Sequence, residues 1–126
     1  MKKITIGARG SQLSQVYVEI VKDLILRNAA NTEDIKFDVK KIKTSGDIHS
    51  KIKLSEIGGK KLFCKEIEEN LLNNQIDIAV HALKDMESED HQELEIGAFI
   101  KRNDPRDALL SNKIKSFDEL KKIKII

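Results

Sequence analysis

The stretch ITIGARGSQLSQVYVEIVKDLI, residues 4–25, changes its apolar period partway along and so decides the fold. Ile4 and Ile6 alternate with polar residues, which predicts a short strand. From Ser11 onward the apolar residues recur every three or four positions, which predicts a helix with Ser11 as its N-cap. The predicted apolar face of this helix consists of Leu13, Val16, Tyr17, Ile20, Val21, Leu24 and Ile25.

Strands and helices are predicted to alternate along the rest of the chain. The predicted segments are strands at 35–41, 76–80 and 94–100, a helix at 63–72, and a short helix after Ser116. Ser116 and Glu119 have the spacing of a capping box, and the polar stretch 44–61 is expected to form a long loop with some short structure. This order predicts an α/β fold with a mainly parallel sheet flanked by helices, where ligands bind beyond the carboxyl ends of the strands.

Composition excludes several classes of protein. The 126 residues suffice for one compact domain, and 23 Lys and Arg against 21 Asp and Glu leave a net charge of only +2. Nucleic-acid-binding proteins usually carry a strong basic excess or aromatic stacking residues, whereas aromatic residues make up 4% here and Trp is absent. We therefore expect no nucleic-acid partner.

Cysteine usage and hydropathy bear on metal binding and location. Cys64 is the single cysteine and cannot form an intramolecular disulfide, and no Cys/His cluster has the spacing of a zinc site. The N-terminus does not resemble a signal peptide, and no stretch is long and apolar enough to span a membrane. We expect a cytoplasmic protein without a metal.

Three segments carry candidate binding or catalytic residues. Arg9 and Ser11 lie where a strand leads into a helix N-terminus, a place that favours anions, although Ser11 could simply cap the helix and Arg9 could be solvated. Lys60 follows paired glycines and could contact a ligand or belong to a flexible turn. Lys84 and Asp85 follow an apolar strand and could act in proton transfer or charge stabilisation, or form a surface ion pair.

Four blocks together resemble the porphobilinogen deaminase family, in the family's order. ARGSQL at 8–13 is similar to the opening Thr-Arg-x-Ser-x-Leu segment, and LSEIGGKKLFCKE at 54–66 resembles the Ile-Gly-Gly-Lys-Gly-Leu-Phe-x-Lys-Glu stretch. DIAVHALKDM at 77–86 resembles the signature Asp-Ile-Ala-Val-His-Ser-x-Lys-Asp. KRNDPRDA at 101–108 is similar to Arg-x-Asp-Pro-Arg-Asp-Ala. The resemblance spans essentially the whole chain.

The resemblance implies a fold and a reaction. Each of the family's first two domains is one lobe of a two-lobed, periplasmic-binding-protein-like anion-binding fold. Residues 1–100 would be most of domain 1 and 101–126 the start of domain 2, with the cofactor-carrying domain 3 absent. Family members (hydroxymethylbilane synthases) are transferases of haem and tetrapyrrole biosynthesis. They join four porphobilinogen molecules into hydroxymethylbilane with release of ammonia, on a dipyrromethane cofactor thioether-linked to a cysteine.

The resemblance also implies residue roles. Asp85 aligns with the catalytic carboxylate, which stabilises positive charge that develops on the substrate. The groups that hold the acetate and propionate arms of dipyrromethane align with Arg9, Ser11, Lys60 and Lys84. Cys64 stands where the family usually has Thr or Val, so the attachment cysteine is absent from this chain. Other departures from the family pattern are Ser14, Lys61, Ala82 and Glu87-Ser88.

The last residues lead to a further set of expectations. The isolated chain is expected to make no hydroxymethylbilane, and residues beyond 100 are expected to contact a second copy, so that the chain self-associates. Two alternatives to a piece of the enzyme stay open. One is a small anion- or solute-binding α/β module without catalysis, and the other is a structural or interaction protein in which Lys84 and Asp85 form an ordinary ion pair.

Overall fold

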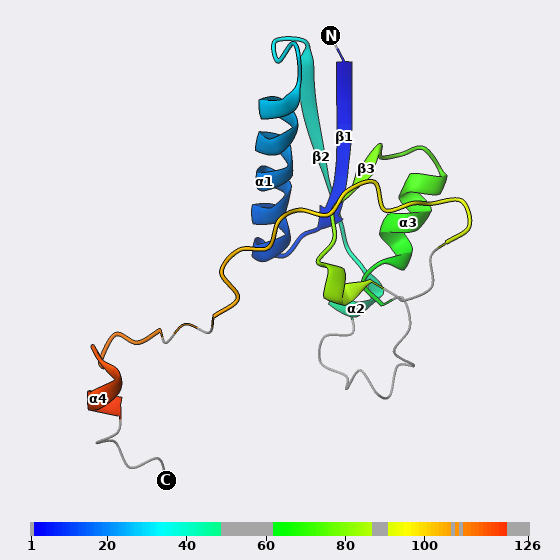
Figure 1. Ribbon diagram of the computed structural model, residues 1–126. Helices are drawn as coiled ribbons and strands as arrows, with labels where there is room; N and C mark the ends of the chain where they lie inside the picture. Colours follow the sequence, from blue (N-terminus) through cyan, green and yellow to red (C-terminus); the bar gives the residue numbers. More distant parts are fainter. Residues whose placement is uncertain (1, 49–61, 87–90, 107, 109, 121–126) are drawn as a thin grey trace. The chain divides into compact units, whose positions relative to one another are not determined.

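The computed structural model describes residues 2–48, 62–86, 91–106, 108 and 110–120 (Figure 1). The elements in chain order are β1 (Lys2–Arg9), α1 (Gln12–Asn28), β2 (Ile35–Ile42), α2 (Ser45–Ile48), α3 (Lys65–Leu72), β3 (Ile78–Ala79), the 3-10 helix η2 (Leu83–Asp85) and α4 (Phe117–Leu120). The chain divides into two compact units, Met1–Glu95 and Ile96–Ile126, which are described separately.

The first unit is built on a three-stranded sheet with the order β2-β1-β3, and both strand pairs are parallel. In register, Ile6 of the central strand pairs with Val39 on one side and Ile78 on the other. Asp77 N–H donates to the Thr5 carbonyl and Val80 N–H to the Gly7 carbonyl, at 2.8 and 2.9 Å. These two bonds extend the pairing beyond the two residues of β3, and the mainly parallel sheet predicted from the sequence is confirmed.

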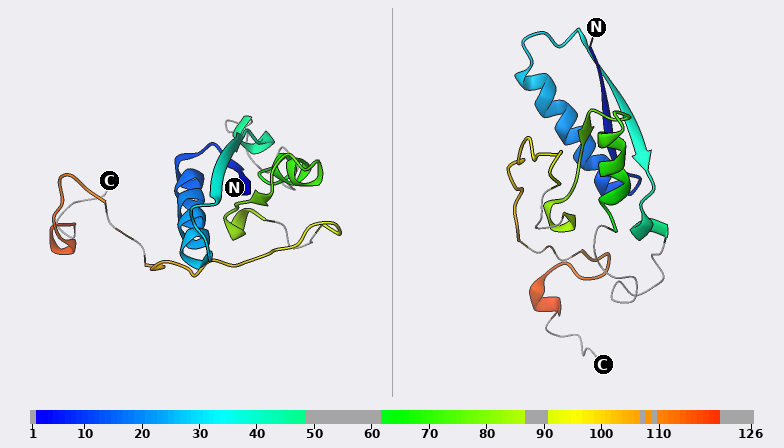
Figure 2. Two further views of the ribbon diagram at one scale, coloured as in Figure 1. Left: turned by 90° about the horizontal axis from the view of Figure 1, so that it is seen from above. Right: turned by 90° about the vertical axis from the view of Figure 1, so that its right-hand side faces the viewer.

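Helices cover both faces of this sheet, α1 on one and α3 on the other (Figures 1 and 2). The core under α1 contains the buried side chains of Ile6, Ala8, Val18 and Val80. The core under α3 contains Ile42, Ile67 and Ile76. Successive side chains of a strand point to opposite faces, so Gly7 faces α3, and a Cβ there would overlap the Ile76 side chain. β1 is therefore buried on both sides, as expected of the central strand in a parallel sheet.

Helix α1 confirms the predicted cap but corrects the predicted buried face. The Ser11 hydroxyl accepts the Ser14 N–H at 3.3 Å, as expected for an N-cap. The fully buried residue of the helix is Val18, which the predicted face omitted, whereas Leu13 and Val16 are 55% and 50% exposed. The apolar stripe of this helix is wider than the surface that the sheet covers. Periodicity alone does not tell which edge of such a stripe faces the core.

The clearest error of the sequence-based prediction lies at residues 94–100, which span the boundary between the two units. Residues 94–100 are irregular, and the predicted strand there is wrong, because the sheet ends at β3 and residues 94–100 pair with no strand in the described part of the chain. The last helix is confirmed as α4. Ser116 Oγ accepts the Glu119 N–H at 3.3 Å, while the Glu119 carboxylate accepts the Lys115 N–H instead of completing the predicted box. Across the described segments, no helix has the length and hydropathy to cross a membrane.

Candidate active site

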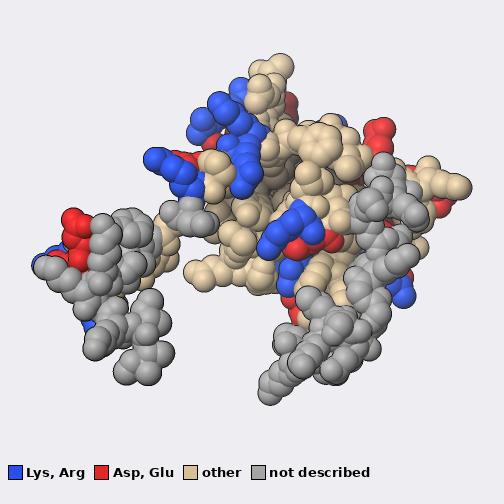
Figure 3. All heavy atoms as spheres, turned by 60° about the horizontal axis from the view of Figure 1, so that its bottom comes forward, with Lys and Arg blue, Asp and Glu red and all other residues tan. Residues whose placement is uncertain are grey.

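The carboxyl ends of the three parallel strands bring together segments that are distant in sequence. Arg9 is the last residue of β1, Thr44 to Asp47 follow β2, and His81 to Asp85 follow β3. Figure 3 brings these ends forward and shows basic and acidic side chains side by side on that face. A ligand site at this edge agrees with the general placement of sites in parallel α/β sheets.

The Arg9 guanidinium lies between two carboxylates. Its Nε is 3.2 and 3.4 Å from the two oxygens of Asp47, and one terminal nitrogen is 2.5 Å from Asp47 Oδ1. The other terminal nitrogen is 3.5 Å from Asp85 Oδ2. All three side chains are partly buried, with exposed fractions of 21% for Arg9 and 24% for each carboxylate. Arg9 is therefore not a solvated surface cation.

Asp47 is held by the backbone and side chain of the segment that carries it. Thr44 N–H and Thr44 Oγ1 donate to Asp47 Oδ2 at 3.2 and 2.8 Å, and Thr44 is fully buried. Burial alone would raise the pKa of Asp47, but hydrogen bonds from Arg9 and Thr44 and the charge of Arg9 lower that pKa below its ordinary value. The carboxylate thus stays ionised, which favours its pairing with Arg9.

Helix α2, which carries Asp47, is fixed against α3 and its preceding turn. Ser45 N–H donates to Glu66 Oε1 at 2.9 Å, and Gly46 N–H donates to the Leu62 carbonyl at 2.7 Å. The Phe63 ring packs on Gly46 so closely that a Cβ there would overlap the ring. The same ring lies 4.1 Å from the Arg9 guanidinium carbon, in a cation–π contact.

A hydrogen bond from Cys64 holds the backbone at Asp85. The fully buried Cys64 thiol donates to the Asp85 carbonyl at 3.0 Å, and its sulfur lies 3.7 Å from His81 Nδ1. Burial lowers the pKa of His81, although Glu68 and Asp85 raise it, while Arg9 adds to the lowering.

The structure gives a different outcome for each of the remaining predicted site residues, Ser11, Lys84 and Lys60. The Ser11 hydroxyl bonds with Ser14, so its capping role is present. Lys84 is exposed on η2, and in the described part of the chain Asp85 pairs with Arg9 and not with Lys84. Lys60 lies outside the described residues. The structure therefore brings Arg9 and Asp85 together, and it does not show the alternative in which Lys84 and Asp85 form an ordinary ion pair among the described residues.

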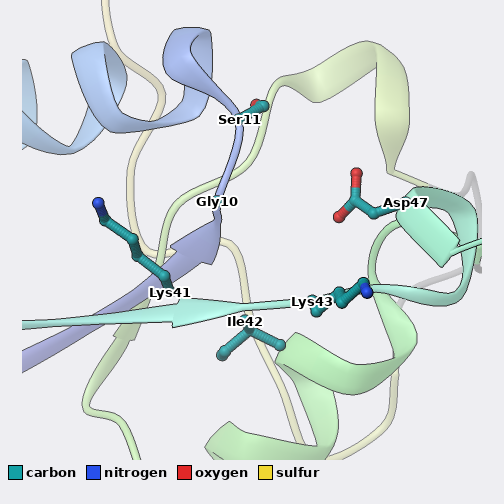
Figure 4. A pocket seen from close by; sticks show the side chains of 6 residues that line it. All are labelled: Gly10, Ser11, Lys41, Ile42, Lys43 and Asp47. Carbon is teal, nitrogen blue, oxygen red and sulfur yellow. The ribbon is translucent and has the colours of Figure 1, made fainter.

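An open pocket of about 310 Å³ lies beside this cluster. Its lining residues are Gly10, Ser11, Lys41, Ile42, Lys43 and Asp47, shown in Figure 4. The Asp47 carboxylate projects from α2, Lys41 lies near the end of β2, and Lys43 follows that strand. Two lysines and one carboxylate therefore belong to the lining of this pocket.

Sequence reasoning missed Asp47 and its support from Thr44 and Phe63. The signal that could have found Asp47 is the rule already applied to the other two strands, because Thr44-Ser45-Gly46-Asp47 directly follows β2. The segment was instead assigned to a long loop. Residues at the ends of all three strands form the candidate site, whereas the sequence-based prediction took residues from the ends of only two.

Comparisons with known proteins give a single family. Residues 4–126 match the family model described as "Porphobilinogen deaminase, dipyromethane cofactor binding domain". The chain is 44% identical over 126 residues to the porphobilinogen deaminase of Syntrophomonas wolfei and 43% identical over 126 residues to that of Francisella tularensis subsp. novicida. It is also 44% identical over 118 residues to that of Natranaerobius thermophilus. The alignments cover 100%, 100% and 94% of this chain but only 40%, 41% and 37% of the relatives.

Proposed function

Because the chain belongs to the porphobilinogen deaminase family, we propose that it provides the catalytic carboxylate of a hydroxymethylbilane synthase. The reaction joins four porphobilinogen molecules into hydroxymethylbilane and releases ammonia. The observation that carries the proposal is the position of Asp85 within the matched DIAVHALKDM block, at the strand ends and in an ion pair with Arg9. The chain spans about 40% of the length of the relatives it matches.

The proposed role of Asp85 follows from the charge that the reaction creates. Loss of ammonia from porphobilinogen leaves a cationic azafulvene; a pyrrole of the growing chain then attacks it and loses a proton. One guanidinium between two carboxylates leaves the cluster of Arg9, Asp47 and Asp85 with an excess of negative charge. A fixed carboxylate that faces developing positive charge lowers the barrier, because it needs no reorganisation when the charge appears.

The cationic side chains near Asp85 fit a ligand with several carboxylates. When bound, dipyrromethane would supply the pyrrole to which the first substrate is joined. We assign its acetate and propionate arms to Arg9, Ser11, Lys60 and Lys84. The N–H groups of Arg9 that Asp47 and Asp85 leave unused, and the exposed ammonium of Lys84, have the chemistry for this role.

The finer organisation is also a proposal. Residues 1–100 would form most of one lobe of a two-lobed, periplasmic-binding-protein-like fold, with 101–126 as the start of the next domain. The chain has one cysteine, Cys64, which is buried, and this sparse cysteine usage favours a reducing compartment such as the cytoplasm. Self-association through the second unit is supported by the exposed apolar side chains of Phe99 and Leu110, which are 71% and 91% exposed.

The proposed activity is tested with the protein at its full natural length. We expect incubation with porphobilinogen to release ammonia and to give hydroxymethylbilane, detected as its cyclised uroporphyrin. Binding of porphobilinogen in calorimetry, with neither ammonia nor tetrapyrrole formed, would instead favour the small anion- or solute-binding module.

A further inference from the structure

The firm partner of Arg9 is Asp47 and not Asp85. Asp47 receives three contacts from Arg9, through Nε and one terminal nitrogen, and the shortest is 2.5 Å. Asp85 makes one contact with Arg9, at 3.5 Å, which is an ion pair longer than a good hydrogen bond. Asp47 therefore fixes the plane of the guanidinium, and the nitrogen that faces Asp85 is placed as a consequence.

Asp47 is fixed in turn by its neighbours in the segment after β2 and by α3. Two donors from the buried Thr44 occupy its Oδ2, and α2 is tied to α3 through Ser45 and Glu66. Phe63 supports the other side of the guanidinium. A side chain held on this many sides keeps one rotamer, so the arrangement is built before any ligand arrives.

We propose that Asp47 is a positioning residue for the reaction, a role that rests on the proposed function of Asp85. Asp47 orients Arg9, and Arg9 orients the Asp85 carboxylate. It also prevents a competing arrangement, since a guanidinium without Asp47 would turn to Asp85 and bind both of its oxygens as a fork. Those oxygens would then face Arg9 and not the substrate, so Asp47 keeps Asp85 directed at the reacting atoms.

The first part of the test follows activity in the protein at its full natural length. Asp47→Asn keeps the size of the side chain but removes its charge. We expect kcat to fall on the order of a hundredfold, the cost of a misplaced catalytic group, while KM for porphobilinogen stays near that of the unaltered protein. The control is Asp23→Asn, which breaks an exposed Arg–Asp pair on α1 and is expected to leave both kinetic constants unchanged.

The second part follows Arg9 by NMR and does not depend on turnover. A guanidinium held by Asp47 gives its own ¹⁵Nε–H signal in the unaltered protein, and we expect Asp47→Asn to broaden or shift that signal. Asp85→Asn is expected to preserve it, because Asp85 does not contact Nε. Loss of the signal in Asp85→Asn together with its retention in Asp47→Asn would overturn the proposal.

The kinetic outcomes distinguish a failure of the Asp47 proposal from a failure of the proposed function. A normal kcat in Asp47→Asn, whether KM is normal or raised, would show that Asp47 does not position Asp85 through Arg9. Should Asp47→Asn fail to fold, Thr44→Val removes one hydrogen bond to Asp47 and is expected to lower kcat about tenfold, whereas full activity would overturn the proposal. Absence of product from the unaltered protein counts against the proposed function instead, and the NMR comparison still decides which carboxylate orders Arg9.

Discussion

Single residues in this protein act through specific pairs. Arg9 is shared between Asp47 and Asp85, and the Cys64 thiol donates a hydrogen bond to the Asp85 carbonyl. A residue type alone would not have revealed these roles. The lysine beside Asp85 in sequence, Lys84, is exposed on η2, while the arginine that pairs with Asp85 lies more than seventy residues away. Sequence neighbours at a strand end need not be chemical partners.

The stability of the protein is predicted to depend on pH through His81. Because burial lowers the pKa of His81, the unfolded chain binds a proton near the ordinary pKa of 6.5 before the folded chain does. The contribution of His81 to the free energy of unfolding is therefore complete above pH 6.5 and lost as pH falls through the folded pKa. We expect urea midpoints to fall between pH 8 and 5, and to fall less in His81→Gln. Equal pH dependence in both proteins would contradict this assignment.

At the scale of elements, α1 and α2 show that neither the apolar surface nor the length of a segment decides its role alone. α1 is apolar around much of its circumference, yet only the part near Val18 packs fully against the sheet. α2 has four residues and little apolar surface, yet it carries Asp47 to Arg9. Close packing, and not length or hydropathy, gives α2 its fixed place.

The packing of α1 is tested by two substitutions of the same type in one helix. Val18→Ala removes two methyl groups from a fully buried position, and we expect it to lower the free energy of unfolding by about 1–3 kcal/mol. Val16→Ala makes the same change at a half-exposed position and is expected to cost less than about 0.5 kcal/mol. Urea denaturation measures both, and a larger loss for Val16→Ala would reverse the assigned face.

The packing of α2 is tested by an alanine substitution at Gly46, with the same substitution at Gly10 as the control. Gly46→Ala places a methyl group into the Phe63 ring, and we expect a loss of about 1–3 kcal/mol in the free energy of unfolding, because the ring has to move. Gly10→Ala meets no atom within 4 Å and is the control, with an expected change below about 0.5 kcal/mol. Comparable stability of both variants in urea would mean that Phe63 yields without cost.

At the scale of the whole molecule, the sequence predicts the order of elements better than their contacts. The change of period in residues 4–25 and the runs around Phe37 and Ile78 were sufficient to predict the parallel α/β unit. Residues 94–100 show the limit, since a strand-like run of residues does not by itself form a strand. Asp47 shows a second limit, because its role depends on a contact thirty-eight residues away in sequence. Local patterns carry no information on such pairings.

The central claim is that these residues contain the catalytic carboxylate of a porphobilinogen deaminase. The most direct measurement is turnover in a chimaera in which these 126 residues replace the corresponding segment of the Syntrophomonas wolfei enzyme, with which they are 44% identical. We predict that the chimaera makes hydroxymethylbilane, and that Asp85→Ala lowers its kcat on the order of a hundredfold or more with an unchanged melting temperature. A folded Asp85→Ala chimaera that turns over porphobilinogen at the parental rate would contradict the account.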